Sequence, residues 1–123
     1  MRILSVDDSK LVRLYVKNAA DVLGFEFLEA GNGEEAWELL ENEEGTVDLI
    51  LLDWHMPGTD GMALLKKLKA DKKYADIPVT MVTTEVEREN VLQAIEAGAR
   101  NYVMKPFTQE KLVGKILESL GMA

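Results

Sequence analysis

The sequence predicts an α/β fold in which helices cover both faces of a parallel five-stranded sheet. Along the 123 residues, short apolar segments alternate with longer segments whose apolar residues recur at helical spacing. The connections are short, and 47% of the residues are hydrophobic, enough for one well-packed core. Alternating strands and helices joined by right-handed crossovers give a parallel sheet with a helical layer on each side. We therefore expect residues 1–123 to form a single domain.

Five strands are expected, at residues 3–6, 25–28, 47–52, 78–82 and 101–104. The third is the clearest, because a short apolar run bounded by turn residues is typical of a strand buried on both faces. This strand leads directly into Asp53, and Pro57 and Gly58 form the turn signal that follows. Pro78 fits only the first position of the fourth strand, since it has no N–H to donate to a neighbouring strand.

Five helices are expected to connect and follow these strands. Three of these helices follow a residue whose side chain can accept a hydrogen bond from the first helical turn: Ser9, Asp60 and Thr108. Gly24 and Gly98 end the first and fourth helices, because glycine readily adopts the left-handed conformation there. The second helix covers residues 34–42 and is closed by residues 43–45, and the fourth covers residues 85–97. Helical spacing predicts the buried faces, which are Val12, Tyr15, Ala19, Val22 and Leu23 in the first helix, Leu64, Leu65 and Leu68 in the third, and Leu112, Ile116, Leu117 and Leu120 in the last.

The commonest order for a small sheet of this kind is 2-1-3-4-5, which gives a flavodoxin-like (βα)5 sandwich of three layers. In this order the first, third, fourth and fifth strands end side by side. The residues at those ends combine three carboxylates, a hydroxyl and an ammonium group: Asp7, Asp8, Asp53, Thr83 and Lys105. Ligands of open α/β sheets bind at this edge, so the sequence predicts a functional site there.

The three carboxylates favour a metal ion. Carboxylates held close together repel one another, and a divalent cation removes that repulsion. Oxygen ligands and retained waters suit Mg²⁺. Helix capping is the alternative explanation for Asp7 and Asp8, but it accounts for only one of them. Acidic residues often end strands before turns, so the position of Asp53 alone is weak evidence for a functional role.

The residues around Asp53 favour phosphoryl chemistry. A carboxylate can attack a phosphoryl group to form an acyl phosphate. Phosphoryl transfer mainly requires in-line positioning and neutralisation of charge, for which Mg²⁺, the Lys105 ammonium and the Thr83 hydroxyl are suited. Taken singly, a lysine before proline or a threonine at a strand end is usually structural.

The composition excludes several other kinds of site. The chain has no cysteine, which rules out disulfides, thiolate metal sites and a cysteine nucleophile, and its single histidine excludes a multi-histidine metal site within one chain. A net charge of −8 argues against general affinity for nucleic acid or an anionic membrane. No segment approaches the roughly 20 apolar residues of a membrane span, and the start of the chain does not form a signal peptide. We therefore expect a cytoplasmic protein.

Several residues together resemble the receiver domain of response regulators, in its stand-alone, CheY-like form. The resemblance covers residues 3–120 and rests on Asp7-Asp8, residues 53–61, Thr83, Tyr102 and Lys105-Pro106-Phe107. Each motif is weak alone, but their combination in this order is specific. The bond before Pro106 is often cis in this family, against about 5–6% of X-Pro bonds in general. The resemblance implies two-component phosphorelay signalling by a single receiver domain with no attached output domain.

The resemblance also implies a role for each residue of the site. Asp53 would accept the phosphoryl group, and Lys105 would contact the phosphoryl oxygens. Asp8, Asp53 and the backbone carbonyl of His55 would bind Mg²⁺ directly, and Asp7 would act through a water molecule.

Other residues would turn phosphorylation into a signal. Thr83 would move to donate a hydrogen bond to the phosphoryl group, and Tyr102 would swing into the space that this opens. The surface formed by the fourth helix, fifth strand and fifth helix would then select a partner. His55, Thr84 and Glu85 would tune how readily water reaches the acyl phosphate. Thr84 departs from the smaller residue that the family often has.

The implied donor is a phosphohistidine on a sensor histidine kinase or a histidine phosphotransfer protein, and a separate protein would be the downstream target. Apart from accepting and losing its own phosphoryl group, the protein is not expected to be an enzyme. We expect a monomer that neither binds nucleic acid directly nor inserts into a membrane. A chemotaxis motor, a phosphate sink and a phosphorelay share such a site, so the pathway stays open.

Two other functions remain as alternatives. A small aspartate-nucleophile phosphatase would need a substrate pocket and usually an inserted cap, for which the short loops leave little material. A nucleotide- or flavin-binding module would need a glycine-rich phosphate loop after the first strand, where Asp7 and Asp8 stand instead. A switch controlled by phosphorylation of Asp53 explains more of the residues than either alternative.

Overall fold

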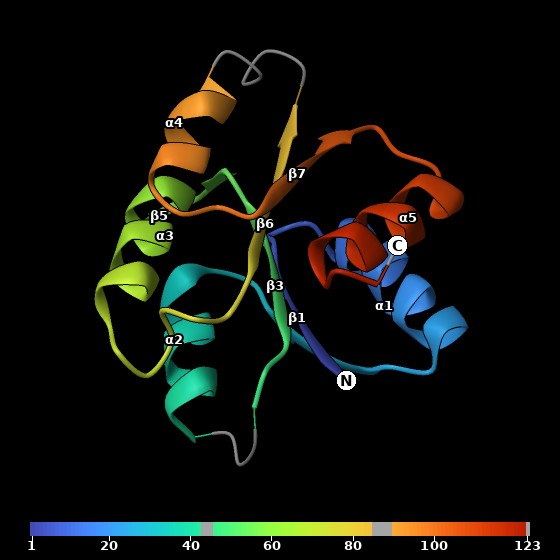
Figure 1. The fold of residues 1–123 in the computed structure, drawn as a ribbon, viewed down its shortest axis with the longest axis horizontal. Helices are drawn as coiled ribbons and strands as arrows, with labels where there is room; N and C mark the ends of the chain where they lie inside the picture. Colours follow the sequence, from blue (N-terminus) through green and yellow to red (C-terminus); the bar gives the residue numbers. More distant parts are fainter. Residues whose placement is uncertain (43–45, 85–89, 123) are drawn as a thin grey trace.

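The computed structural model describes residues 1–42, 46–84 and 90–122, and its centre is a parallel five-stranded sheet (Figure 1). The strands are β1 (Arg2–Val6), β2 (Glu26–Ala30), β3 (Leu49–Asp53), β6 (Val79–Thr84) and β7 (Asn101–Lys105). Their order is β2-β1-β3-β6-β7, and every neighbouring pair is parallel. The predicted order 2-1-3-4-5 is therefore confirmed, with β6 and β7 as the fourth and fifth strands of the sheet.

Helices cover both faces of the sheet, as expected (Figure 1). On one face lie α1 (Lys10–Leu23) and α5 (Gln109–Ser119), and on the other lie α2 (Gly33–Asn42), α3 (Gly61–Ala70) and α4 (Val91–Glu96). The three predicted caps are confirmed, since the first helical turns donate backbone hydrogen bonds to the side chains of Ser9, Asp60 and Thr108. Gly24 ends α1 in the left-handed conformation, with a φ of 73°.

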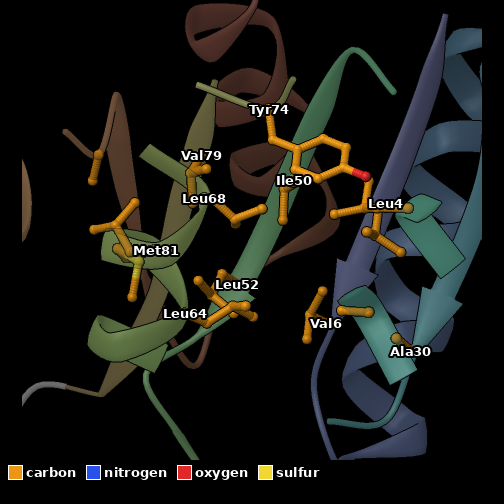
Figure 2. Close-up of a cluster of buried hydrophobic side chains, with 14 of the residues drawn as sticks. Leu4, Val6, Ala30, Ile50, Leu52, Leu64, Leu68, Tyr74, Val79 and Met81 are labelled. Atoms are coloured by element: carbon orange, nitrogen blue, oxygen red, sulfur yellow. The ribbon is translucent and has the colours of Figure 1, made fainter. Parts of the chain in front are cut away.

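The apolar core has two parts, one on each face of the sheet, because successive residues of a strand point to opposite faces. Leu4 and Ile50 point into the part beneath α2 and α3, which Figure 2 shows. Ile3 and Leu51 point into the other part, beneath α1 and α5. All of β3 is buried, as its apolar run predicted. Full burial of each such side chain contributes about 1.5–3 kcal/mol, which anchors the strand that ends at Asp53.

The predicted buried face of α1 is partly wrong. Tyr15 and Val22 are exposed. The buried residues of this helix are small or short: Val16, Ala19 and Ala20. They let the helix pack closely on the sheet, whereas the Tyr15 ring lies edge-on against Phe107, with 6.0 Å between ring centroids.

The predicted buried face of α5 is also only partly confirmed. Leu112 and Ile116 are buried, but Leu117 and Leu120 are half-buried. Ser119 is buried in their place. Its hydroxyl donates to the carbonyl of Lys115 and lies 2.6 Å from the hydroxyl of Thr80, so the burial of this polar group is compensated.

A short antiparallel hairpin, which was not predicted, follows β3. Its strands are β4 (His55–Met56) and β5 (Thr59–Asp60), joined by Pro57 and Gly58. Gly58 has a φ of 71°, a left-handed value that favours glycine. Strands of two residues carry too little alternation of apolar and polar residues to be recognised in a sequence.

The remaining strand boundaries shift by one or two residues. The fourth strand of the sheet, for example, begins at Val79 instead of Pro78. Of the helix predicted over residues 85–97, only α4 is described as α-helix, because residues 85–89 lie outside the described ranges. The predicted closure of α2 by residues 43–45 lies outside them too. Within the described ranges, every helix is too short or too polar to span a lipid bilayer.

Candidate functional site

The sheet brings the predicted site residues to one edge. Asp53 is the last residue of β3, Lys105 is the last residue of β7, and Asp7 directly follows β1. Thr83 is the last but one residue of β6, the strand between β3 and β7. Because parallel strands end at the same edge, Asp53 and Lys105 meet although they are 52 residues apart in the sequence.

Asp7, Asp8 and Asp53 form an acidic cluster at this edge. Each offers one carboxylate oxygen, and these oxygens lie within 4.8 Å of one another. Asp7 and Asp53 are buried, with exposed fractions of 2% and 5%, whereas Asp8 is exposed. The cluster therefore faces solvent on the side of Asp8.

The ammonium group of Lys105 contacts two of these carboxylates. Its Nζ donates a hydrogen bond to Oδ1 of Asp53 over 3.1 Å and lies 3.4 Å from Oδ2 of Asp7. The pKa of Asp53 is raised to about 6, mainly by burial and then by the charge of Asp7, against the opposing effect of Lys105. Burial alone would lower the pKa of Lys105, but the charges of Asp7 and Asp53 outweigh it and raise that pKa above its usual value.

The acidic cluster fits a divalent cation. Oδ1 of Asp7 accepts a hydrogen bond from the backbone N–H of Ser9 over 2.9 Å, but the buried Oδ2 has no hydrogen-bond partner among the described residues. Its contact with the Lys105 ammonium, over 3.4 Å, is an ion pair. Such an oxygen carries a desolvation cost that a bound cation would offset. Carboxylate oxygens with access to solvent suit Mg²⁺, which is usually bound by one or two carboxylates and keeps several waters.

The two residues predicted to switch lie on adjacent strands. Thr83 is fully buried, and its hydroxyl donates a hydrogen bond to the carbonyl of Thr84 over 3.2 Å. Tyr102 is half-buried and packs against the core beneath α2 and α3. The ammonium of Lys115, in α5, lies 5.2 Å from the centre of the Tyr102 ring. Tyr102 thus lies close to α5, one of the two helices of the predicted partner surface.

Of the three positions predicted to tune reaction rates, His55 and Thr84 are described. His55 is exposed at the start of β4, and Thr84 is exposed at the end of β6. Glu85 lies outside the described residues. The cis bond between Lys105 and Pro106, which the resemblance led us to expect, is present.

Arg13, in α1, was not predicted to belong to the site. Its guanidinium donates a hydrogen bond to the backbone carbonyl of Asp7 and forms an ion pair with Glu29 of β2, with 2.7 Å between the paired atoms. It therefore ties the loop that carries Asp7 to two neighbouring elements. No local pattern marks this role, because Arg13 and Glu29 meet only once the sheet has formed.

Comparisons with known proteins agree on one family. A model of the response regulator receiver domain family matches residues 3–117. The Chemotaxis protein CheY homolog of Campylobacter jejuni is 45% identical over 98% of this chain and 93% of the relative. Chemotaxis protein CheY1 of Helicobacter pylori strain J99 is 43% identical over 98% of both chains. The solved structure of chemotaxis response regulator CheY4 of Vibrio cholerae has a TM-score of 0.87 and 29% identity, covering 97% of this chain and 98% of that one.

Proposed function

Because the chain belongs to the response regulator receiver domain family, we propose that Asp53 accepts a phosphoryl group and thereby switches a surface that binds a partner. The chain is a receiver domain of two-component phosphorelay signalling. One observation carries the assignment of Asp53: it ends a strand beside Asp7 and accepts a hydrogen bond from Lys105. The alternative of an independent phosphatase is not favoured, because two relatives that this chain covers over 93% and 98% of their length are named as chemotaxis proteins.

In the proposed reaction, a carboxylate oxygen of Asp53 attacks the phosphorus atom of a phosphohistidine. The new O–P bond forms as the P–N bond breaks, and the imidazole nitrogen keeps the electron pair of that bond and takes up a proton. The Lys105 ammonium, already at the carboxylate, is placed to contact the phosphoryl oxygens. Attack of water on the acyl phosphate later restores Asp53 and releases phosphate. We assign no enzymatic activity beyond these two self-reactions.

We further propose Asp8, Asp53 and the backbone carbonyl of His55 as the direct ligands of Mg²⁺, with Asp7 acting through a water molecule. When bound, Mg²⁺ supplies positive charge that offsets the charge on the phosphoryl oxygens. The exposure of Asp8 supports this arrangement, because it leaves one side of the cluster accessible to the donor.

Thr83 and Tyr102 would pass the modification to the surface formed by α4, β7 and α5. In this proposal the Thr83 hydroxyl leaves the carbonyl of Thr84 and donates to a phosphoryl oxygen, and Tyr102 moves inward. Two apolar residues of α4, Leu92 and Ile95, are 74% and 42% exposed. This face therefore has apolar area to bury against a downstream protein.

The proposed donor is a sensor histidine kinase or a histidine phosphotransfer protein, and the proposed target is a separate protein that binds the receiver as a monomer in the cytoplasm. The relatives favour chemotaxis as the pathway. Deletion of the gene is then expected to change the frequency with which swimming cells reverse. Wild type should restore that frequency and Asp53→Asn should not; unchanged swimming in the deletion strain would rule out chemotaxis without affecting the assignment of Asp53.

Incubation with a small phosphodonor and Mg²⁺ tests the role of Asp53. The wild-type protein is expected to gain one hydroxylamine-sensitive phosphoryl group by intact mass, and Asp53→Asn is expected to gain none. Asp76→Asn is the matched control, because it makes the same change of charge at an exposed carboxylate outside the cluster. Phosphorylation of Asp53→Asn at the wild-type rate would show that another residue is the acceptor.

A further inference from the structure

A groove of about 670 Å³ lies between α2, the β4–β5 hairpin and α3, outside the acidic cluster. Its volume is within the range of roughly 300–1,000 Å³ that is usual for binding pockets. One wall contains the ring of Trp37. Four acidic residues also line it: Glu34, Glu38, Glu41 and Asp60. The groove thus combines an aromatic surface with carboxylates, a combination that none of the proposed signalling steps uses.

The groove has a net negative charge, because Lys67 is the one basic residue among its described lining residues. Within residues 1–42, 46–84 and 90–122, no lysine or arginine forms an ion pair with Glu34, Glu38 or Glu41, and all three are exposed. Glu38 also lines a second hollow on α2, together with Glu29 and Glu35. A concave surface with charge of one sign concentrates ligands of the opposite sign.

The ring of Trp37 already binds a cation from its own chain. The ammonium of Lys67, in α3, lies 4.0 Å from the centre of the ring. Tyr74 is buried and packs edge-on against the same ring, with 5.2 Å between centroids, which fixes the ring in place. Lys67 itself is exposed, so its flexible side chain is free to swing away. The Lys67 ammonium marks where the head group of another cation would lie.

We propose that this groove docks a basic segment of a partner protein. A lysine or arginine of that segment replaces Lys67 over Trp37, and the glutamates of α2 surround its charge. Arginine fits best, because a planar guanidinium can stack on the ring and pair with a carboxylate at once. The proposal is independent of the role of Asp53, since no residue of the acidic cluster lines the groove.

The groove joins two elements that a bound segment would contact together. The hydroxyl of Thr59, in β5, accepts a hydrogen bond over 3.0 Å from the backbone N–H of Gly33, the first residue of α2. A side chain at Gly33 would collide with Thr59, since an added Cβ would lie 2.7 Å from its methyl carbon. This close packing keeps the two walls of the groove at a fixed separation, which favours binding without rearrangement.

NMR titration of the labelled protein with the peptide acetyl-Gly-Arg-Gly-Arg-Gly-amide tests the proposal. The indole N–H of Trp37 and the backbone amides of Glu38 and Thr59 are expected to shift and saturate, and a peptide with glutamate in place of arginine should shift none of them. Removal of two charges by Glu34→Gln with Glu41→Gln should weaken binding about fivefold. Lys67→Ala should strengthen it about threefold, because it frees the ring.

The matched control removes two negative charges elsewhere, by Glu96→Gln with Glu110→Gln on α4 and α5. It should leave the affinity unchanged. Equal weakening by both pairs of substitutions would overturn the proposal, because binding would then depend on net charge alone. Equal binding of the two peptides, or the same shifts produced by Mg²⁺ alone or by raising the protein concentration, would also overturn it.

Discussion

Lys105 donates a hydrogen bond to Asp53 at the edge of the sheet, with 3.1 Å between Nζ and Oδ1, and the same ammonium lies 3.4 Å from Oδ2 of Asp7. One cation therefore serves two buried carboxylates, with Asp8 close by. The charge of Lys105 does not fully offset the effects of burial and of repulsion between the carboxylates, since the pKa of Asp53 is still raised to about 6. The metal-free protein thus holds excess negative charge at its own site.

Asp53→Asn is expected to stabilise the metal-free protein at pH 8. The pKa of Asp53 is about 6 in the folded state and 3.8 in a model peptide, so the folded state binds this proton more tightly than the unfolded state does. The stability that this group contributes is therefore present below pH 3.8 and lost as the pH rises through 6. A shift of about two units corresponds to about 3 kcal/mol, and asparagine avoids this loss because it does not ionise.

Urea unfolding in EDTA measures this effect. Asp53→Asn should exceed wild type in free energy of unfolding by about 1–3 kcal/mol at pH 8, and the difference should shrink at pH 5. Asp76→Asn, at an exposed carboxylate, should follow wild type at both values. A difference that is the same at pH 5 and pH 8 would mean that ionisation of Asp53 is not its cause.

The affinity for Mg²⁺ is expected to rise with pH and to level off above about pH 7, because a proton on Asp53 competes with the ion. With a pKa of about 6, this competition should weaken binding roughly tenfold at pH 5 relative to pH 7. Trp54 adjoins Asp53 and is buried, so Mg²⁺ should quench part of its emission. Titration of Trp37→Phe isolates this signal, because the chain has 2 tryptophans. A pH-independent affinity would contradict the prediction.

Lys105→Met is expected to raise the pKa of Asp53 further above 6. Lys105 lowers that pKa both through its charge and through its hydrogen bond, whereas burial and Asp7 would remain. Carbon-detected NMR of the aspartate carboxyl groups follows the titration directly. Lys115→Met is the control, since it removes an equal charge next to Tyr102. An unchanged or lower pKa in Lys105→Met would show that the ammonium does not govern the ionisation of Asp53.

Thr83→Ala is expected to leave Asp53 able to accept a phosphoryl group but to reduce the response of the α4–β7–α5 surface. Thr83 is fully buried with its hydroxyl bonded to the carbonyl of Thr84; alanine removes this donor together with the methyl group, whereas serine removes the methyl group alone. Beryllofluoride with Mg²⁺ should shift the ring resonances of Tyr102 in wild type and in Thr83→Ser, and much less in Thr83→Ala. Equal shifts in all three proteins would exclude the hydroxyl as the link.

The meeting of Asp53 and Lys105 could be predicted because short buried strands that alternate with helices allow few parallel arrangements. The buried face of α1 could not, since its apolar residues surround too much of the helix for their spacing to separate Tyr15 from Val16. The role of Arg13 was missed for a different reason. It depends on contacts that form only in the folded chain, and an exposed arginine on a helix has the same local sequence.

Gly61→Ala is expected to lower the free energy of unfolding by about 1–3 kcal/mol and to weaken Mg²⁺ binding. Gly61 begins α3, and its N–H donates a hydrogen bond to the carbonyl of Trp54 over 2.8 Å. An added Cβ would overlap the carbonyl oxygen of Asp53 and lie 2.8 Å from that of Trp54. Both oxygens belong to the backbone at the end of β3, so we expect relief of the overlap to shift that backbone and, with it, the Asp53 carboxylate.

Gly114→Ala, in the middle of α5, is the matched control. Apart from its chain neighbours and the backbone of α5 itself, no atom lies within 4 Å of a Cβ added there, so alanine should be neutral or should stabilise the helix by up to about 1 kcal/mol. Urea unfolding and the quenching of Trp54 by Mg²⁺ would compare the two variants. If Gly61→Ala matched Gly114→Ala in both measurements, the end of β3 would have room to yield. The position of the Asp53 carboxylate would then not depend on the close approach of α3.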